Sequence, residues 1–145
     1  RLTIAPMADL FYNHPSGALK VIALTGTKGK SSTAYYLKYI LDEYLEERGQ
    51  PESGVISSIQ TYDGVDRFES HITTPDALDL QRHFDHAVHT GIEYLTMEVS
   101  SQALKYHRSL CTDFAGGVVV EQVGHRGDGQ AHVPHQEAGQ IDVGV

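Results

Sequence analysis

The sequence predicts an α/β protein in which a parallel sheet of the phosphate-loop (P-loop) type is flanked by helices. Three observations support this fold class. Short apolar runs alternate with segments of helical periodicity, glycine-rich stretches join them, and residues 20–59 contain one strand–loop–helix–strand unit. A unit of this kind connects parallel strands by a crossover, so the first two strands are expected to run in the same direction.

The composition narrows the class of protein further. With 145 residues, of which 40% are hydrophobic and 21% charged, the chain can form one folded domain. A formal net charge of −8 argues against a nucleic-acid partner. No apolar run is long enough for a membrane span, no signal peptide is visible, and the single cysteine, Cys111, fits a reducing cytoplasm.

Three apolar runs with β-branched residues are predicted to be buried strands. They are Lys20–Thr25, Gly54–Ile59 and Ile92–Val99. A turn or hairpin is predicted within Tyr62–Ser70, because an Asp-Gly pair lies there between residues that suit strands. Residues 1–19 are interrupted by proline and glycine, so they form a lead-in segment with one short helical turn around Met7–Phe11.

Helical periodicity marks the segments between these strands. The first helix is predicted over Ser32–Arg48 and ends at the stop signal Gly49–Pro51. Its apolar positions are Leu37, Ile40, Leu41, Tyr44 and Leu45.

The second predicted helix has Thr74 as its N-cap, Pro75 at its first position, and Gly91 as its end. Its apolar positions are Ala77, Leu80, Phe84 and Val88. A further helix is expected to start within Ser100–Arg108.

A glycine-rich loop follows the first strand and opens the first helix. The loop consists of Gly26, Thr27, Lys28, Gly29, Lys30, Ser31 and Ser32. Its backbone N–H groups and the helix N-terminus predict an anion cradle, with Lys30 on the outer phosphates of a nucleotide and the Ser31 hydroxyl on Mg²⁺. The loop is a short variant, since Leu24 stands where the common pattern has its first glycine. The alternative is a glycine-lined turn with an incidental lysine.

A second candidate residue, Glu98, stands near the C-terminal end of the third predicted strand. Ligands of open parallel sheets bind beyond the carboxyl ends of the strands. An acid at this edge, close to the phosphate loop, can hold the Mg²⁺ that bridges the phosphates. Taken alone, Glu98 would be interpreted as a half-exposed carboxylate at a strand end, and the phosphate loop beside it is what favours the metal-binding interpretation.

Several motifs together resemble one family. The segments "VIALTGTKGKSS", "TTPDALDL" and "MEVSSQAL", the last followed by "HR", are similar to the central ATPase domain of the Mur ligases. The resemblance is strongest to the branch that adds the third residue to the UDP-N-acetylmuramoyl dipeptide of the cell wall. It covers about Phe11 to Arg108, and the motifs occur in the family's order and spacing.

The resemblance implies a reaction and roles for residues. Members of the family use ATP to activate a carboxylate as an acyl phosphate, which the amino group of an incoming amino acid attacks to give an amide in the bacterial cytoplasm. By this resemblance Lys30 and the loop amides hold the β- and γ-phosphates, while Ser31 and Glu98 bind Mg²⁺. The residues implied to contact the UDP-N-acetylmuramoyl-peptide are Thr73, Thr74, Ser100 and Arg108.

The last part of the chain departs from this pattern. We expect a lead-in segment at 1–19, an ATP-binding α/β core at 20–110 and a tail or insertion rich in glycine, histidine and valine at 111–145, either genuine or the product of an altered reading frame. Within it only the final Ile141–Val145 looks like the strand that the family places next. The family's N-terminal UDP-binding and C-terminal amino-acid-selecting domains have no counterpart here and the chain begins with Arg1, so we expect a fragment that does not complete the ligation by itself.

Histidines form two further groups. His83, His86 and His89 recur every third residue of the second predicted helix, and a solvated helix face is the favoured interpretation over a zinc site. His125, His132 and His135 lie in the atypical tail, where metal binding is a weak alternative.

Three other classes of function remain as alternatives. A folylpolyglutamate synthetase-like ligase also has a Gly-Thr-x-Gly-Lys loop, but the "TTPDALDL" and "MEVSS" segments favour the muramoyl-peptide branch. A phosphotransfer kinase or GTPase would have glycine at position 24 and a strand that ends in Asp followed by Gly, and the sequence has neither. A non-catalytic nucleotide-binding or interaction module is the alternative outside the enzymes.

Overall fold

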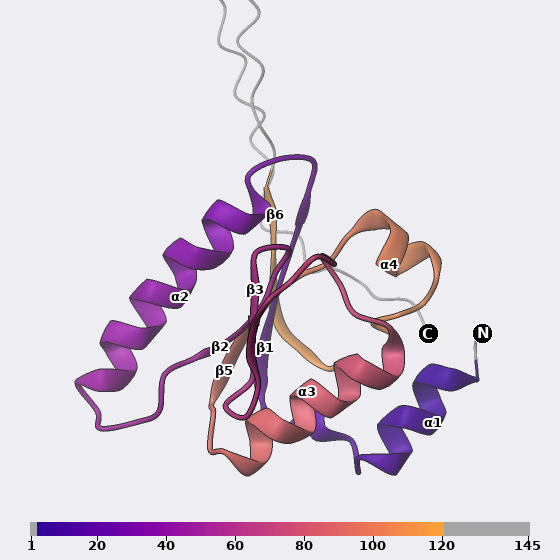
Figure 1. Cartoon of the computed structure of the whole chain (residues 1–145), viewed down its shortest axis with the longest axis horizontal. Coiled ribbons are helices and arrows are strands. Elements are labelled where there is room, and N and C mark those ends of the chain that lie inside the picture. Colours follow the sequence, from indigo (N-terminus) through magenta and orange to yellow (C-terminus); the bar gives the residue numbers. More distant parts are fainter. Residues whose placement is uncertain (1–2, 121–145) are drawn as a thin grey trace, which may run out of the picture.

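The computed structural model describes residues 3–120 of the chain. Within them, strands form one sheet, and their bounds are β1 (Lys20–Gly26), β2 (Gly54–Ile56), β3 (Gln60–Tyr62), β4 (Arg67–Glu69), β5 (Tyr94–Glu98) and β6 (Phe114–Val120). The helices are α1 (Ile4–Phe11), the 3₁₀-helix η1 (Pro15–Ala18), α2 (Lys30–Glu46), α3 (Ala77–His89) and α4 (Ser101–Lys105). Figure 1 shows their arrangement, which confirms the expected α/β class.

Four neighbouring strands of the sheet are parallel. The strand order is β4-β3-β2-β5-β1-β6, in which β2, β5, β1 and β6 run in one direction. β3 and β4 form an antiparallel hairpin at one edge, around the Asp-Gly pair that predicted it. The predicted crossover from β1 through α2 to a parallel β2 is therefore confirmed, and β5 lies between these two strands.

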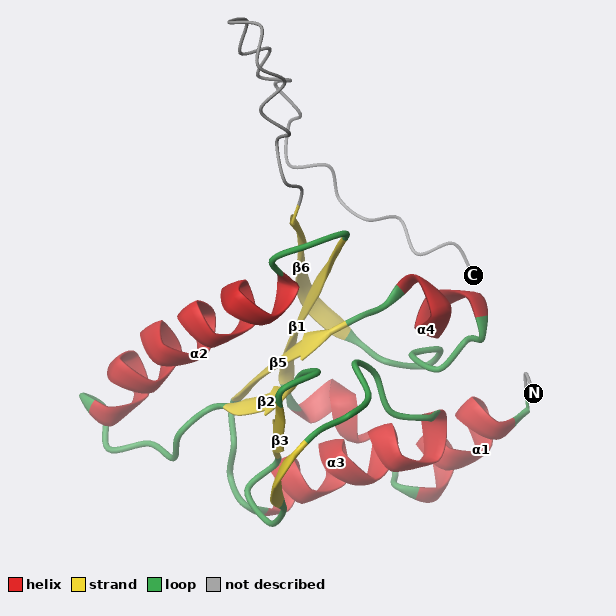
Figure 2. Ribbon diagram, turned by 45° about the horizontal axis from the view of Figure 1, so that its top comes forward, coloured by secondary structure: helices red, strands yellow, loops and turns green. Residues whose placement is uncertain are grey.

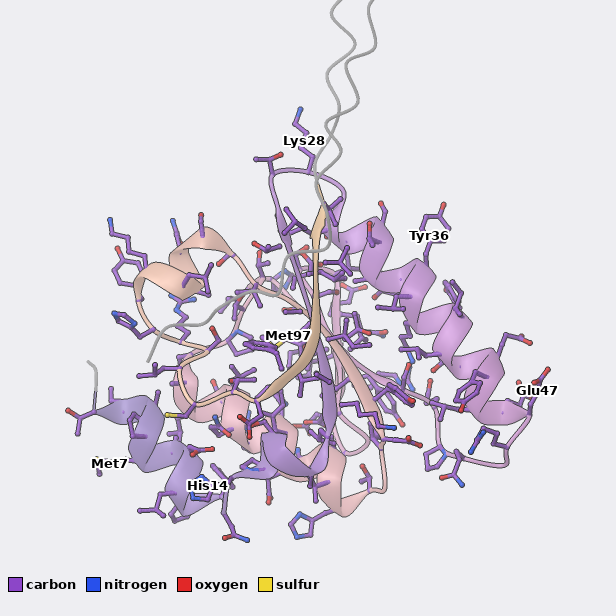
Figure 3. All side chains as sticks on the ribbon, turned by 180° about the vertical axis from the view of Figure 1, so that it is seen from behind. Met7, His14, Lys28, Tyr36, Glu47 and Met97 are labelled. Atoms are coloured by element: carbon purple, nitrogen blue, oxygen red, sulfur yellow. The ribbon has the colours of Figure 1, made fainter. Side chains whose placement is uncertain are left out.

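Helices cover both faces of the sheet (Figure 2). α2 packs on one face against β1, β5 and β2, while α3, with α1 beside it, lies on the other. Met97 of β5 lies near the middle of the molecule (Figure 3). The main core cluster consists of Leu19, Val21, Ile56, Leu80, Phe84, Ala87, Ile92, Leu95, Met97, Val99 and Ala103. Because three of these residues flank Glu98 closely in sequence, the core also fixes the end of β5.

The first long helix differs from its predicted pattern. α2 begins two residues earlier than predicted, and of its five predicted apolar positions only Leu45 is buried. Ile40 is 66% exposed, whereas Lys38 is buried. The Lys38 ammonium donates to Asp42 at 2.8 Å, to Glu52 at 3.3 Å and to the Ser53 carbonyl at 2.7 Å. Since these partners satisfy the buried charge, a lysine occupies the face that periodicity alone assigns to apolar residues.

The start of α3 corrects a second expectation. Thr74 is not the N-cap of this helix, and Pro75 is not its first residue. The cap is Asp76, whose side chain accepts hydrogen bonds from the amides of Leu78 and Asp79 at 3.1 and 3.0 Å. The predicted apolar positions of the helix do face the core, with Val88 at its margin.

The edge strand β6 corrects a third expectation. The next strand was predicted at Ile141–Val145, which lies outside the described residues, but Phe114–Val120 already pairs with β1 in parallel. The two strands approach closely at Gly26, where an added Cβ would lie 1.9 Å from the Val120 carbonyl oxygen. A run of glycine and valine that looked atypical is therefore a strand.

The histidines of α3 correct a fourth expectation, because only His89 lies on a solvated face. His83 is 2% exposed and His86 is half-buried. Both imidazoles lie against Asp63, the fully buried carboxylate of the β3–β4 turn. Burial raises the pKa of the Asp63 carboxyl, but hydrogen bonds from the two imidazoles and from two backbone amides lower it to about 2.

The same turn sits directly on the C-terminal end of α3. Gly64 has φ +92°, and a Cβ added there would lie 2.0 Å from the Thr90 hydroxyl oxygen. Glycine is thus required both by the backbone conformation and by the close approach of the turn to the helix.

Among residues 3–120, no helix combines the length and the apolar character that a membrane crossing needs.

A pair of glycine substitutions tests the close packing of the β3–β4 turn against the end of α3. We expect Gly64→Ala to lower the free energy of unfolding by roughly 2–4 kcal/mol, from a left-handed backbone and a steric clash together. The control is Gly49→Ala, which has φ +65° and no atom within 4 Å of the added Cβ. This control should cost only about 1 kcal/mol. The measurement is urea unfolding followed by circular dichroism, and equal losses in the two variants would show that the turn does not dock as described.

Candidate functional site

The candidate site lies at the carboxyl ends of the parallel strands. The loop between β1 and α2 projects beyond this edge (Figure 1), and Lys28 stands at its tip (Figure 3). In the register of β1 against β5, Leu24 is opposite Glu98. The amide of Val99 donates to the Leu24 carbonyl at 2.8 Å, which extends the pairing to the start of the loop. The two features that the sequence predicted separately are thereby side by side.

The glycine loop is short and tightly held. The Lys30 ammonium reaches back across it and donates to the Gly26 carbonyl at 2.9 Å. Gly29 is the N-cap of α2, and no side chain caps the helix, so its first N–H groups stay available to an anion. Thr27, Lys28 and Ser32 are exposed. An exposed loop with a lysine across it and free helix amides is suited to bind phosphate groups.

Glu98 is buried rather than half-exposed. Its relative exposure is 1%, and one carboxylate oxygen accepts a hydrogen bond from the Ser58 amide at 3.2 Å. The Ser58 hydroxyl in turn lies 2.9 Å from that of Ser31, at the start of α2. Ser58 therefore joins the predicted acid to the predicted loop hydroxyl.

Ser58 was not among the site residues predicted from the sequence. Its position carried a signal, since it lies two residues beyond the end of β2, at the same edge of the sheet. A polar residue just beyond a buried parallel strand is a candidate site residue for the same reason as Glu98.

The residues implied for substrate binding meet around Thr74. The Thr74 hydroxyl donates to the Glu98 carbonyl at 2.8 Å and accepts from the Ser100 amide at 3.2 Å. Arg108 donates from its guanidinium to the Thr74 carbonyl at 2.9 Å. Thr73 is adjacent and half-buried. These contacts place all four residues beside the end of β5.

One of these side chains already has a structural role. The Ser100 hydroxyl accepts a hydrogen bond from the Ala103 amide at 3.1 Å and is the N-cap of α4. Because a hydroxyl is also a donor, Ser100 can cap the helix and still donate to a ligand.

The residues proposed for Mg²⁺ fit such an ion. The Ser31 hydroxyl and the Glu98 carboxylate are both hard oxygen donors, and Ser58 holds them next to each other. A buried carboxylate with one amide donor is also poorly compensated electrostatically, so a bound cation would stabilise it. When bound, Mg²⁺ would neutralise phosphate charge.

The fold, the loop and the buried acid together define a P-loop-type α/β domain. Residues 24–124 match the family model described as the Mur ligase middle domain, and the chain belongs to the Mur ligase family. This match confirms the resemblance and corrects its expected end, because it continues past Arg108 through β6.

Two curated relatives are equally similar to the chain. The UDP-N-acetylmuramoyl-L-alanyl-D-glutamate–2,6-diaminopimelate ligase of Clostridioides difficile is 42% identical over 118 residues, covering 81% of this chain and 23% of the relative. The UDP-N-acetylmuramoyl-L-alanyl-D-glutamate–L-lysine ligase of Enterococcus faecalis is 42% identical over 118 residues, covering 81% and 22%. The chain thus spans about a quarter of the length of these relatives.

A solved structure supports the fold independently. A UDP-N-acetylmuramoyl-L-alanyl-D-glutamate–2,6-diaminopimelate ligase superposes with a TM-score of 0.60 at 22% sequence identity. The superposition covers 87% of this chain and 26% of that one. The α/β arrangement described above is therefore shared with a ligase of known structure.

The bridging role of Thr74 can be tested with its neighbour as the control. Thr74→Val removes the hydroxyl that serves both Glu98 and Ser100, so we expect the free energy of unfolding to fall by about 1–3 kcal/mol. Thr73→Val is the matched control, because the Thr73 side chain makes no hydrogen bond to the described part of the chain. Urea unfolding measures both, and a Thr74→Val variant as stable as the control would contradict the bridge.

Proposed function

We propose that this chain is the ATP-binding central part of an ATP-dependent amide ligase that acts on a UDP-N-acetylmuramoyl-peptide in peptidoglycan synthesis. One observation carries the proposal. Four hydrogen bonds, made partly by side chains and partly by the backbone, connect neighbouring residues from Ser31 in the loop, through Ser58, Glu98 and Thr74, to the guanidinium of Arg108. They join a phosphate-binding loop to a second polar group suited to an anionic substrate, as a transfer between two bound molecules requires.

In this proposal the loop binds ATP. The amides at the start of α2 and the Lys30 ammonium would hold the β- and γ-phosphates, for which Lys30 gives up its bond to the Gly26 carbonyl. Ser31 and Glu98 would bind Mg²⁺ between the phosphates. Gly26 and Gly29, with Thr27, Lys28 and Ser32, complete the nucleotide-binding loop.

On the other side of Glu98, the peptide substrate would bind. Thr73, Thr74 and Ser100 offer hydroxyl groups, and the planar guanidinium of Arg108 suits a carboxylate or a phosphate. ATP would transfer its γ-phosphoryl group to the substrate carboxylate, releasing ADP and giving an acyl phosphate. The amino group of the amino acid would then attack the acyl carbon, forming the amide and releasing inorganic phosphate. The reaction brings anions together, so positioning and charge neutralisation by Lys30, Arg108 and Mg²⁺ are the catalytic contribution of this domain.

The remaining parts of the reaction belong to other domains in this proposal. The relatives are about four times as long as the matched segment, which leaves room for a domain that binds the UDP group and one that selects the amino acid. Relatives named for diaminopimelate and for lysine are equally similar, which fits an amino-acid choice made outside this segment.

Calorimetric titration with Mg-ATP tests the nucleotide site. We expect the parent chain to bind and Lys30→Ala to lose about tenfold or more in affinity, because a charge-assisted contact to phosphate is worth roughly 1.5–3 kcal/mol. Lys20→Ala is the matched control, since it removes the same charge at the exposed opposite end of β1.

The outcomes separate cleanly. Binding by the parent and by Lys20→Ala, with a loss confined to Lys30→Ala, supports a phosphate cradle in the loop. Equal affinities in all three chains, or no binding by the parent, would contradict the proposed nucleotide site.

A further inference from the structure

A second group of side chains with metal-binding chemistry lies away from the nucleotide loop. Asp63 and Asp66 come from the turn between β3 and β4, and His83 and His86 come from α3. The potential ligand atoms of these four residues all lie within 4.8 Å of one another. We propose that they bind a divalent transition-metal ion of the zinc class, in a site separate from the one proposed for Mg²⁺.

The geometry brings both imidazoles to one carboxylate. The Nδ1 atoms of His83 and His86 lie 2.6 and 2.9 Å from the same oxygen of Asp63. The other oxygen of Asp63 already accepts from the amides of Val65 and Asp66 at 2.9 and 2.7 Å. One carboxylate oxygen is therefore the meeting point of two imidazole nitrogens, and both are good metal ligands once each gives up its N–H···O bond to Asp63 and carries its proton on Nε2 instead.

No hydrogen bond accounts for the position of the fourth side chain, Asp66. An Asp66 carboxylate oxygen lies 3.6 Å from Nδ1 of His86, beyond hydrogen-bond distance, and within residues 3–120 the Asp66 carboxylate accepts no hydrogen bond. It nevertheless points into the cluster beside a second carboxylate. A cation between the two acids and the two imidazoles would give the Asp66 carboxylate a direct partner and would join all four side chains.

Charge and ligand type favour a transition metal. With neutral imidazoles, the four side chains carry two negative charges, one of them on a fully buried carboxylate, and a divalent ion balances both. Two imidazoles and two carboxylates form the four-ligand set that suits Zn²⁺, whereas Mg²⁺ prefers oxygen ligands alone. Asp63 and His83 close the inner side of the site, and the partly exposed Asp66 and His86 leave an entry from solvent.

The position of the cluster indicates what the ion would do. It would strengthen the attachment of the β3–β4 turn to α3, which the structure already holds through the Asp63–histidine hydrogen bonds and the close contact at Gly64. Ser58 precedes this hairpin and Thr74 follows it, so the ion would stabilise the segment that connects the two sides of the candidate site.

The experiment is a competition for Zn²⁺ between the full 145-residue chain and a chromophoric chelator, with Mg²⁺ in large excess. The discriminating variants are Asp66→Asn, which keeps the shape of the turn, and His86→Gln. The matched controls are His89→Gln, on the solvated face of the same helix, and a triple variant in which His125, His132 and His135 become glutamine. Circular dichroism establishes that each variant is folded.

We expect one Zn²⁺ per chain at this site and a loss of at least about tenfold in affinity in Asp66→Asn and His86→Gln, with neither control affected. Asp66→Asn decides the result if His86→Gln does not fold. No Zn²⁺ binding by the parent, or an affinity that falls only in the tail variant or in no variant, would overturn the proposal. None of these outcomes depends on ATP binding.

Discussion

The parallel register of β1 against β5 is the constraint on which the candidate site depends. It places Leu24 opposite Glu98, so that the phosphate loop and the buried acid begin at the same height of the sheet. The apolar side chains on both sides of these strands fix that register, because a slip of one residue would turn each core side chain toward the other face. The energy that stabilises the core therefore also positions the polar groups beyond it.

Burial of the Glu98 carboxylate explains the residues around it. A buried carboxylate is costly unless hydrogen bonds or a cation compensate it, and the Ser58 amide supplies one such bond. The backbone carbonyl of Glu98 is satisfied separately, by the Thr74 hydroxyl. The end of β5 thus contacts the loop side through Ser58 and the Arg108 side through Thr74.

The parts of the structure that depend on local pattern could be predicted from the sequence. The crossover, the Asp-Gly hairpin, the core side of α3 and the position of Glu98 were visible in periodicity, turn chemistry and strand ends. The parts that were not predicted depend on contacts between distant residues. Lys38 is buried because Asp42 of the same helix and two groups of the following loop, the Glu52 carboxylate and the Ser53 carbonyl, accept its hydrogen bonds. His83 is buried because its imidazole has a hydrogen-bond partner in Asp63. Thr74 was predicted to be the cap of α3, but the cap is Asp76. The residues of β6 were assigned to an atypical tail, but they pair with β1.

The central claim is that Glu98 holds the Mg²⁺ of a nucleotide bound to the loop. Its most direct test is the affinity of the chain for ATP with and without Mg²⁺, compared between the parent and Glu98→Gln, a variant that keeps the shape and a hydrogen-bond acceptor for Ser58. We expect Mg²⁺ to strengthen ATP binding by the parent and to have little effect on ATP binding by the variant. The affinity for metal-free ATP should be similar in the two chains. An equal effect of Mg²⁺ in both chains would contradict the claim.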